Sequence, residues 1–334
     1  MTLASEPVSL PALVAAFPFP FVGDTYRYST NIEPAAQTVS TATGAWGQRV
    51  IDIDGEYEAE LAERARILAA DPSRHAVLPH MRPAAWDAML ALMTELATGY
   101  PDTMSLTRTG DTWHWRNQKL GIAHDFTLGD ESSLPAEPLA YIGGQVQEDI
   151  VLLDQRDGDL FADAGVVTFA SGWSFGFDLG MTFLEIHGPV PRLRESGVIT
   201  RAREFLMRLQ AGGVYRRTNW TLGAGRRLDA STEAYPEWAP DVARAQTVDD
   251  ETFGRLIQLR VEVQHLIRLP ESGAICFLIR TYMLPLSEVA AVEPWRARMA
   301  SVLTELPDDL ADYKGFLPYR DRVVSWLTAY PSAQ

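Results

Sequence analysis

The spacing of apolar residues predicts several helices. Over residues 56–70 apolar side chains recur on one helical face, and Pro72 follows directly after the run. A second helix is predicted over about 83–98, because Pro83 suits a first helical turn and Gly99 suits the position after a last turn. The same periodicity predicts further helices over residues 139–153, 200–210, 294–306 and about 311–330. Residues 1–35 are expected to be irregular, and residues 35–48, rich in Ser, Thr, Ala and Gly, are expected to form a loop.

Alternation with a period of two predicts the strands. It marks residues 214–222, 256–269 and 274–284, and the Pro-Glu-Ser-Gly turn at 270–273 joins the last two runs into a hairpin. A second hairpin is predicted over 105–117, around Gly110, with His114 on its surface. In the long strand one face carries Gln258, Arg260, Glu262 and Gln264, and the other is apolar apart from His265. The polar face can be the solvent side of a sheet or the floor of a pocket, and the pattern alone favours solvent.

These elements predict an α+β protein with a mainly antiparallel sheet and flanking helices. The 334 residues are interpreted as a single elaborated domain, 1–334. Its N-terminal helical and irregular part reaches to about residue 100, the sheet occupies about 101–285, and C-terminal helices fill about 286–334. Within the predicted helix over 139–153, the run Gln147-Glu148-Asp149 is interpreted as a solvated face or a helix-end contact, and one member could point into a site.

Charge and cysteine content exclude several classes of protein. The formal net charge of −15 argues against nucleic acid or an anionic membrane as the main partner, and favours a cationic substrate or a basic protein partner. The single cysteine, Cys276, excludes a disulfide framework or a four-cysteine iron–sulfur cluster within this chain, and its apolar neighbours indicate a core position. The N-terminus lacks a basic signal-peptide region, and prolines interrupt its short apolar run, which predicts a cytoplasmic protein without a membrane span.

The candidate chemistry centres on His187, which directly precedes Gly-Pro-Val-Pro. The two prolines fix the backbone, so the histidine stands on a rigid support. Large apolar residues precede it, namely Trp173, Phe175, Phe177 and Phe183. Two interpretations remain open: a structural histidine bonded to a backbone carbonyl, or the polar anchor of a flat apolar ligand.

No other motif gives a competing chemistry. The sequence has no HExxH, GxSxG or paired-cysteine motif, and the isolated Gly223-Ala-Gly225 is too weak to predict nucleotide binding. A heme needs an axial ligand, an apolar slot and polar partners for its propionates, and His187, the aromatic residues and the polar segments 216–220 and 260–264 match these needs. Arg217 and Glu262 are the candidate polar groups on the catalytic side.

At these residues the chain resembles the heme-dependent oxidative N-demethylases, the catalytic α subunits of dimethylamine-type monooxygenases. The matching segments span about residues 17–328: Val50 to Tyr57, Gln147-Glu-Asp149, Leu152-Leu153, Trp173, Ile186-His-Gly-Pro-Val-Pro191, Arg217-Thr-Asn-Trp220, Arg260-Val-Glu262, Arg268-Leu-Pro-Glu-Ser-Gly273 and Ile279-Arg-Thr-Tyr282.

The resemblance implies a PAS-like domain that binds heme b through His187. It implies O₂-dependent conversion of a small methylated amine to the demethylated amine and formaldehyde. It also implies that NADPH, FMN and a [2Fe–2S] cluster act on separate reductase subunits. The further cofactor-binding residues expected from the matching segments are Trp173, Asn219, Trp220 and Arg260.

The chain departs from the family pattern at Val263, His265 and Asp178, which leaves the substrate and the partner surface open. His265 is a second candidate ligand, although the strand period places it opposite Glu262. The alternatives to an N-demethylase are a heme-based PAS sensor of gas or redox state and a heme-binding relative that has lost activity.

Overall fold

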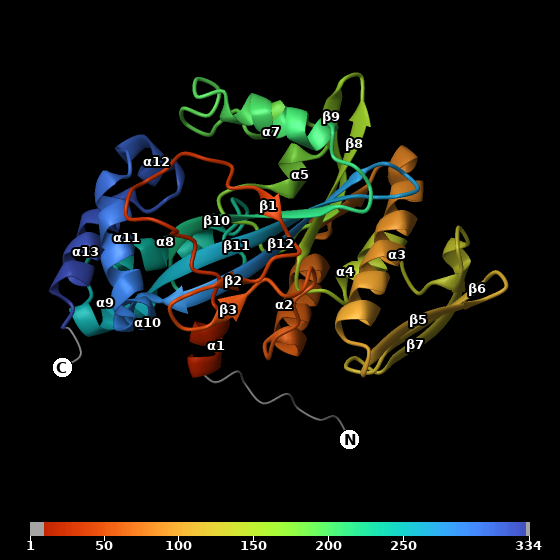
Figure 1. Cartoon of the computed structure of the whole chain (residues 1–334), viewed down its shortest axis with the longest axis horizontal. Helices are drawn as coiled ribbons and strands as arrows, with labels where there is room; N and C mark the ends of the chain where they lie inside the picture. Colours follow the sequence, from red (N-terminus) through yellow and green to blue (C-terminus); the bar gives the residue numbers. More distant parts are fainter. Residues whose placement is uncertain (1–9, 332–334) are drawn as a thin grey trace.

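The fold is built on a seven-stranded sheet, whose long strands run through the middle of the molecule in Figure 1. The computed structural model describes residues 10–331. Every neighbouring pair of strands in this sheet is antiparallel. In spatial order the strands are β1 (Glu33–Pro34), β10 (Val214–Ala224), β11 (Ile257–Arg268), β12 (Ile275–Pro285), β8 (Asp149–Arg156), β9 (Asp159–Val166) and β4 (His75–Val77).

Two smaller sheets flank this one. Three strands, β5 (Met104–Thr109), β6 (Thr112–Asn117) and β7 (Ile122–Thr127), form a separate antiparallel sheet beyond α3 (Arg82–Gly99). A two-stranded ribbon pairs β2 (Val39–Ser40) with β3 (Ala45–Trp46). The expectation of a mainly antiparallel sheet with flanking helices is therefore confirmed.

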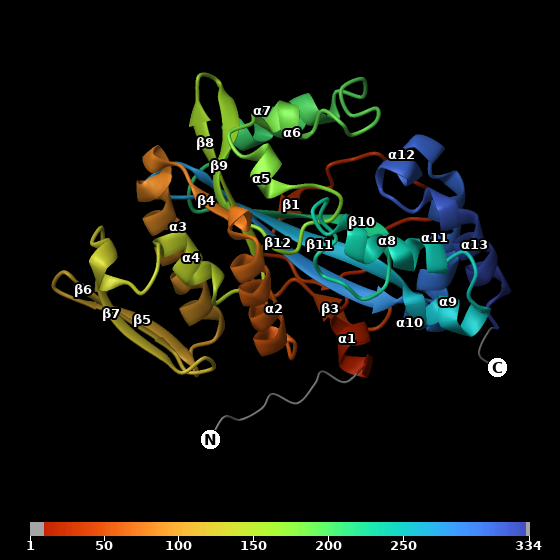
Figure 2. The ribbon, with the colours of Figure 1, turned by 180° about the vertical axis from the view of Figure 1, so that it is seen from behind.

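Helices cover both faces of the large sheet (Figures 1 and 2). One face packs at one end on α3 and α4 (Pro138–Gly143), and at the other end on helices from the C-terminal third. The opposite face is covered by the short helices α5 (Phe175–Asp178) and α6 (Phe183–Ile186) and by α7 (Val198–Met207). The remaining helices are α1 (Leu10–Ala16), α2 (Tyr57–Ala70), α8 (Tyr235–Arg244), α9 (Asp250–Leu256), α10 (Leu286–Ala291), α11 (Glu293–Glu305), α12 (Asp308–Tyr313) and α13 (Leu317–Ala329), with 3₁₀ turns η1 (Pro72–Arg74), η2 (Pro79–Met81) and η3 (Glu131–Ser133).

Most of the long elements agree with the sequence predictions. The helices predicted at 56–70, 83–98, 200–210 and 294–306 and all the predicted strands are confirmed within a few residues. The C-terminal helix predicted at about 311–330 is divided into α12 and α13, because Gly315 adopts a positive φ of 79° between them. Of the N-terminal region predicted to be irregular, residues 1–9 lie outside the described residues, and α1 forms directly after them.

The helix predicted over 139–153 is correct only for residues 139–143 and wrong for the rest. Helix α4 ends at Gly143, and strand β8 begins at Asp149, where β-branched Ile150 and Val151 favour extended backbone. Gln147, Glu148 and Asp149 are consequently buried, at 0–1% exposure, and do not form a solvated face. The apolar residues of α4 and those of β8 resemble one helical pattern in the sequence, because the turn between the two elements is short.

The preference for solvent beside the long strand is also wrong. Gln258, Arg260, Glu262 and Gln264 are all at most 7% exposed. Both faces of β11 are covered, so its polar row lies inside the molecule. The alternative interpretation of that row, the floor of a pocket, is the one that its burial favours.

A buried ion pair fastens α2 to the turn before β8. Arg64 donates to Asp149 Oδ1 at 3.0 Å and to the carbonyl oxygens of Gly143, at 2.7 Å, and Gln147, at 3.1 Å. Asp149 also accepts from the backbone N–H groups of Thr168 and Phe169. Each side chain is 1% exposed, so every polar atom here depends on its partner.

Among the described residues, no helix is long and apolar enough to cross a membrane.

This arrangement predicts that two arginines of α2 contribute very differently to the free energy of unfolding. We expect Arg64→Ala to lower the free energy of unfolding by about 3–5 kcal/mol, because Asp149 would remain buried without its partner. Arg66→Ala is the matched control, since Arg66 makes only an exposed pair with Glu63. Urea unfolding followed by circular dichroism measures both, and similar stabilities for the two variants would contradict the structural role of Arg64.

Candidate functional site

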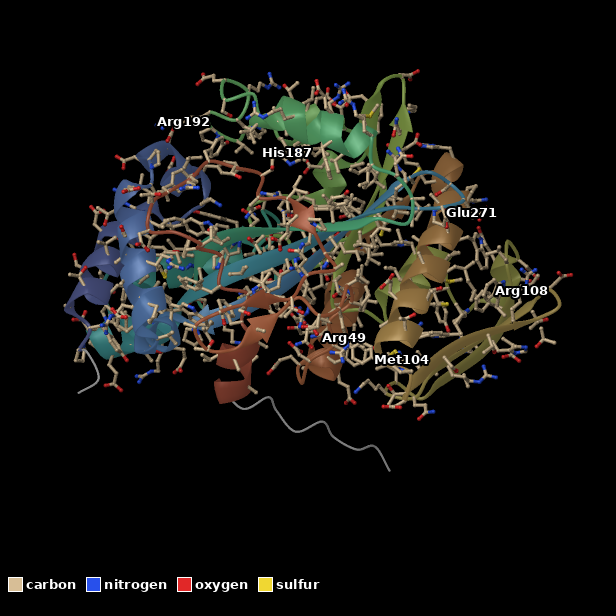
Figure 3. The ribbon with its side chains drawn as sticks, viewed as in Figure 1. Arg49, Met104, Arg108, His187, Arg192 and Glu271 are labelled. Carbon is tan, nitrogen blue, oxygen red and sulfur yellow. The ribbon has the colours of Figure 1, made fainter. Side chains whose placement is uncertain are left out.

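His187 lies at the end of a short, firmly capped helix. Helix α6 begins with a capping box, in which Thr182 Oγ1 accepts from the Glu185 N–H at 3.2 Å and Glu185 Oε2 accepts from the Thr182 N–H at 2.8 Å. His187 is the C-terminal cap, and Pro189 prevents the helix from continuing. The histidine therefore has a fixed position on the α7 side of the sheet, as Figure 3 shows.

The hydrogen bond of His187 determines which ring nitrogen carries the proton. Its Nδ1 lies 2.8 Å from the carbonyl oxygen of Phe183, which can only accept, so Nδ1 must donate. The lone pair therefore resides on Nε2, and that atom has no hydrogen-bond partner within residues 10–331. Burial, with a contribution from the charge of Arg217, lowers the pKa of His187 to about 4. The imidazole is neutral near pH 7 and has the form that ligates metals.

A row of polar side chains lies on the same face of the sheet as α6, and the charge of one member, Arg217, contributes to the lowered pKa of His187. The alternation of β10 and β11 directs Arg217, Asn219, Glu262 and Gln264 to the same face, because Arg217 pairs with Gln264 and Asn219 with Glu262. Arg217 Nη1 donates to Gln264 Oε1 at 2.9 Å. Glu262 Oε2 accepts from Gln264 Nε2 at 3.0 Å and from Asn219 Nδ2 at 3.3 Å. The four side chains form one continuous hydrogen-bonded network.

Lys314 extends the network from the turn between α12 and α13. Its Nζ donates to Asn219 Oδ1 at 3.3 Å and to the Trp220 carbonyl oxygen at 2.6 Å. Burial, opposed by the charge of Glu262 and reinforced by that of Arg217, lowers the pKa of Lys314 to about 8. Sequence reasoning missed this residue, because an isolated lysine 50 positions beyond Gln264 carries no pattern that links it to the strands.

Two more acidic groups border the row. Burial, and then the charges of Glu262 and Asp178, raise the pKa of Tyr313. Burial, followed by the charge of Glu233, raises the pKa of Asp178 to about 6. Asp178, one of the departures from the family pattern, lies on α5, which covers the same face of the sheet that carries the polar row.

The site carries more positive than negative charge. Glu262 Oε1 lies 3.8 Å from Arg260 Nε, and Arg217 and Lys314 also act on this carboxylate. Within the row Arg217 and Lys314 are the cations and Glu262 is the carboxylate, whereas Arg260 also interacts with Asp149, Asp229 and Glu60. Such a surplus suits a ligand that brings carboxylates, since buried charges need compensation.

Of the other predicted site residues, Arg260 and Trp173 lie on the same face of the sheet as Glu262, and Trp220 does not. Arg260 shares the face of Glu262, but its guanidinium also holds the carbonyl oxygens of Leu228 and Phe169. Trp173 is partly buried in the apolar cluster that includes Phe183 and Ile186. Trp220 points to the opposite face, where its ring lies 4.7 Å from that of Phe21, measured between centroids. Its side chain therefore belongs to the core beneath the sheet.

The second candidate ligands lie elsewhere. His265 faces the other side of β11, is 3% exposed, and both of its ring nitrogens lack a hydrogen-bond partner within the described residues. Cys276 is fully buried among apolar side chains, which confirms its predicted core position. His114 forms a 3.0 Å contact with Asp125 on the partly exposed hairpin. Within the described residues, neither His265 nor Cys276 takes part in the hydrogen-bonded network of Arg217, Gln264, Glu262, Asn219 and Lys314.

Two surface clefts also lie apart from His187. One of about 290 Å³ is bordered by α1, α2 and the free edge of β12, with Asp52, Asp54 and Glu60 in its wall. The other, of about 430 Å³, is bordered by α7 and the start of β10, with Arg201, Phe205 and Tyr215 in its wall. Neither cleft is lined by Glu262, Arg217 or His187.

The residues around His187 fit a heme. A neutral imidazole with an available Nε2 lone pair is a donor of the kind that heme iron takes, and the Phe183 ring stands 4.3 Å from the imidazole, centroid to centroid. Arg217, Asn219 and Lys314 supply N–H donors and positive charge for carboxylates. The donor set and the charge balance agree with such a ligand.

Comparison with known protein families supports the same chemistry. One family model matches residues 41–324, which is most of the chain. The family is described as haem-dependent oxidative N-demethylase, alpha subunit-like. The chain belongs to this family, whose name describes a heme-dependent oxidoreductase that removes N-methyl groups.

Proposed function

We propose that this chain is the catalytic subunit of an oxidative N-demethylase that acts on a small methylated amine. The observation that carries the proposal is the neutral His187, whose Nδ1 is bonded to the Phe183 carbonyl oxygen and whose Nε2 lone pair is available, with the charge of Arg217 acting on the ring. In this proposal residues 1–334 form a single PAS-like domain that binds heme b. O₂, two electrons and two protons convert the methylated amine into the demethylated amine, formaldehyde and water.

His187 would hold the heme through Nε2, with its Nδ1–H fixed by the Phe183 carbonyl. Trp173 and Phe183 would contribute apolar surface, and Arg217, Asn219 and Lys314 would receive the propionates. The bound heme supplies the redox centre for oxygen reduction and oxidation of the methyl group. The chain's own residues bind and orient the amine and hold protons.

Glu262 is the proposed partner of the amine. A methylated amine is a cation at neutral pH, and its desolvation beside an apolar surface requires compensation. Glu262 Oε2 already accepts two amide hydrogen bonds, whereas Oε1 accepts none within the described residues. Oε1 is therefore the acceptor for an ammonium N–H. Arg217 orients the carboxylate through Gln264, and Lys314 Nζ, with its pKa of about 8, holds a proton close to Asn219.

Electrons are proposed to come from NADPH through FMN and a [2Fe–2S] cluster on partner subunits. The name of the family, which describes an alpha subunit, supports a multi-subunit enzyme. The net charge of the whole chain favours a basic partner, but residues 188–210 directly after His187 contain five arginines and only two glutamates. Arg194, Arg201 and Arg208 are exposed there and have no carboxylate partner within 4.0 Å in residues 10–331. This local surface, the 188–210 segment, favours an acidic electron donor.

The ligand assignment predicts that His187→Ala loses most of its heme while the apoprotein still folds. One coordination bond is removed, and the apolar clusters that hold the fold are untouched. The measurement is the Soret absorbance per protein after reconstitution, together with circular dichroism. His265→Leu is the matched control and should keep its heme. A full, unshifted Soret band in His187→Ala would contradict the assignment.

The role of Glu262 predicts a selective loss of amine affinity. Glu262→Gln keeps the shape and removes the charge, so heme content should remain and amine binding should weaken by about 1–3 kcal/mol, the scale of a hydrogen bond to a charged group. Titration of the ferric heme spectrum with dimethylamine measures the affinity. Glu204→Gln, an exposed substitution on α7, is the control. Equal affinities would remove Glu262 from the binding site, and no response to any small amine in the wild type would favour a heme sensor.

The 188–210 segment predicts charge-dependent electron delivery. With the partner reductase and NADPH at low salt, the Arg201→Glu/Arg208→Glu variant should be reduced about 10–100-fold more slowly, within the range that electrostatic steering supplies. Stopped-flow absorbance of the heme follows reduction. Dithionite should reduce the variant and the wild type equally, and Arg66→Glu on α2 should behave as wild type. If the rate of reduction by the reductase depends neither on salt nor on these substitutions, the 188–210 segment is excluded as the docking surface.

A further inference from the structure

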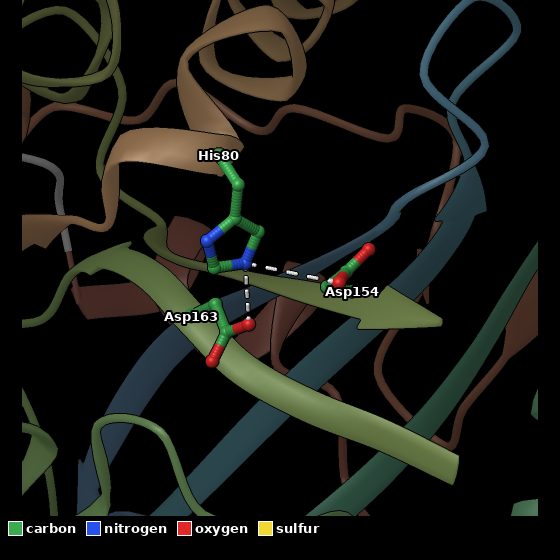
Figure 4. A group of neighbouring side chains, drawn as sticks. All are labelled: His80, Asp154 and Asp163. Carbon is green, nitrogen blue, oxygen red and sulfur yellow. Dashed lines mark hydrogen bonds and ion pairs between the residues drawn. The ribbon is translucent and has the colours of Figure 1, made fainter. Parts of the chain in front are cut away.

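Away from His187, three side chains of the kind that ligate metals converge from three elements (Figure 4). They are His80 on η2, Asp154 on β8 and Asp163 on β9. His80 Nε2 lies 2.8 Å from Asp163 Oδ2 and 3.7 Å from Asp154 Oδ2. One ligand atom from each residue falls within 4.8 Å of the other two.

A β-bulge brings Asp163 to this group. In the β8–β9 ladder Leu152 pairs with Ala164 and Leu153 pairs with Ala162, so Asp163 is the extra residue without a partner across the strands. A bulge redirects a side chain relative to regular alternation and is common beside functional sites. The carbonyl oxygen of Asp163 also accepts from the Leu78 N–H at 3.0 Å, which ties η2 and therefore His80 to the bulge.

The three ligand atoms already point to one position that suits a cation. Arg156 Nη1 lies 2.7 Å from Asp154 Oδ2 and 3.4 Å from His80 Nε2, and it also contacts Asp163 Oδ2. The guanidinium thus contacts all three ligands at once. Its side chain is 36% exposed and its guanidinium lies over the ring of Phe161, so the side of the cluster that Arg156 covers borders solvent.

The second oxygen of Asp163 remains unsatisfied. The side chain is completely buried, yet Oδ1 has no hydrogen-bond partner within the part of the chain that the structure describes. An unpaired buried carboxylate oxygen is costly, and such groups in native proteins commonly contact an ion or an ordered water. Arginine alone therefore does not use the full acceptor capacity of this carboxylate.

We propose that His80, Asp154 and Asp163 form a divalent metal site that takes Zn²⁺ in place of the Arg156 guanidinium. One imidazole and two carboxylates suit zinc better than the all-oxygen ions Ca²⁺ and Mg²⁺. Bonds of about 2.0–2.1 Å in a tetrahedron separate ligand atoms by about 3.3 Å, and the observed 2.8 and 3.7 Å distances lie on either side of that value. The exposed side of His80 leaves room for water as the fourth ligand. The metal ties η2 and the start of α3 to the β8–β9 hairpin.

Zinc titration calorimetry tests the site on tag-free, heme-loaded protein that has been treated with chelator and dialysed. The wild type should bind one Zn²⁺ that His80→Ala loses, with an affinity drop of at least about 100-fold, because a direct ligand should matter more than the outer partners that are worth 10–100-fold. Arg156→Gln should bind Zn²⁺ more tightly than the wild type, since it removes the competing cation. Zinc should also raise the melting temperature of the wild type but not of His80→Ala.

The control variant is Asp157→Asn, which removes an exposed carboxylate from the turn of the same hairpin. It should bind Zn²⁺ as the wild type does. If His80→Ala does not fold, Asp154→Asn gives the same comparison. Absence of binding in the wild type, equal binding in His80→Ala, or weaker binding in Arg156→Gln would overturn the proposal and leave the Arg156 ion-pair cluster as the complete structure.

Discussion

The pairing of β10 with β11 is the constraint on which the candidate site depends. Because side chains alternate across a strand, the register that opposes Asn219 to Glu262 also places Arg217 and Gln264 on the same face. A slip by one residue would exchange this polar row with Val261, Val263 and the core beneath them. The long, well-packed pairing of these strands therefore positions the hydrogen-bonded network as well as the core.

His187 is held by a different kind of constraint. It belongs to a helix of only four residues, so its position relies on the Thr182–Glu185 capping box and on the prolines that follow. The same short helix supplies the Phe183 carbonyl that fixes the imidazole tautomer. Local backbone contacts thus fix the tautomer of His187, and the strand pairing fixes the positions of the polar side chains. In the proposed function these two features serve the same heme.

Buried charge recurs throughout the molecule and is differently balanced at each place. Arg64 and Asp149 form a pair whose remaining polar atoms are bonded to the backbone, which is a structural arrangement. Around Glu262 the cations outnumber the carboxylate, and at His80 the acidic groups exceed the single arginine. A surplus of positive or of negative charge at a buried or partly buried site favours a ligand of the opposite charge. The overall net charge of −15 predicts neither local surplus.

The sequence by itself determined the long strands, the main helices and the rigid setting of His187, because these depend on local periodicity and on proline. The resemblance to a known family added the expectation that His187 binds a heme and that the polar segments belong to the same site. Only the tertiary structure decided that both faces of β11 are covered, that Gln147 to Asp149 are buried, and that Trp220 faces away from Glu262. It also brought Lys314 to Asn219 and Asp163 to His80. These contacts join residues 83 to 95 positions apart, and no local pattern encodes which distant segment covers a given face.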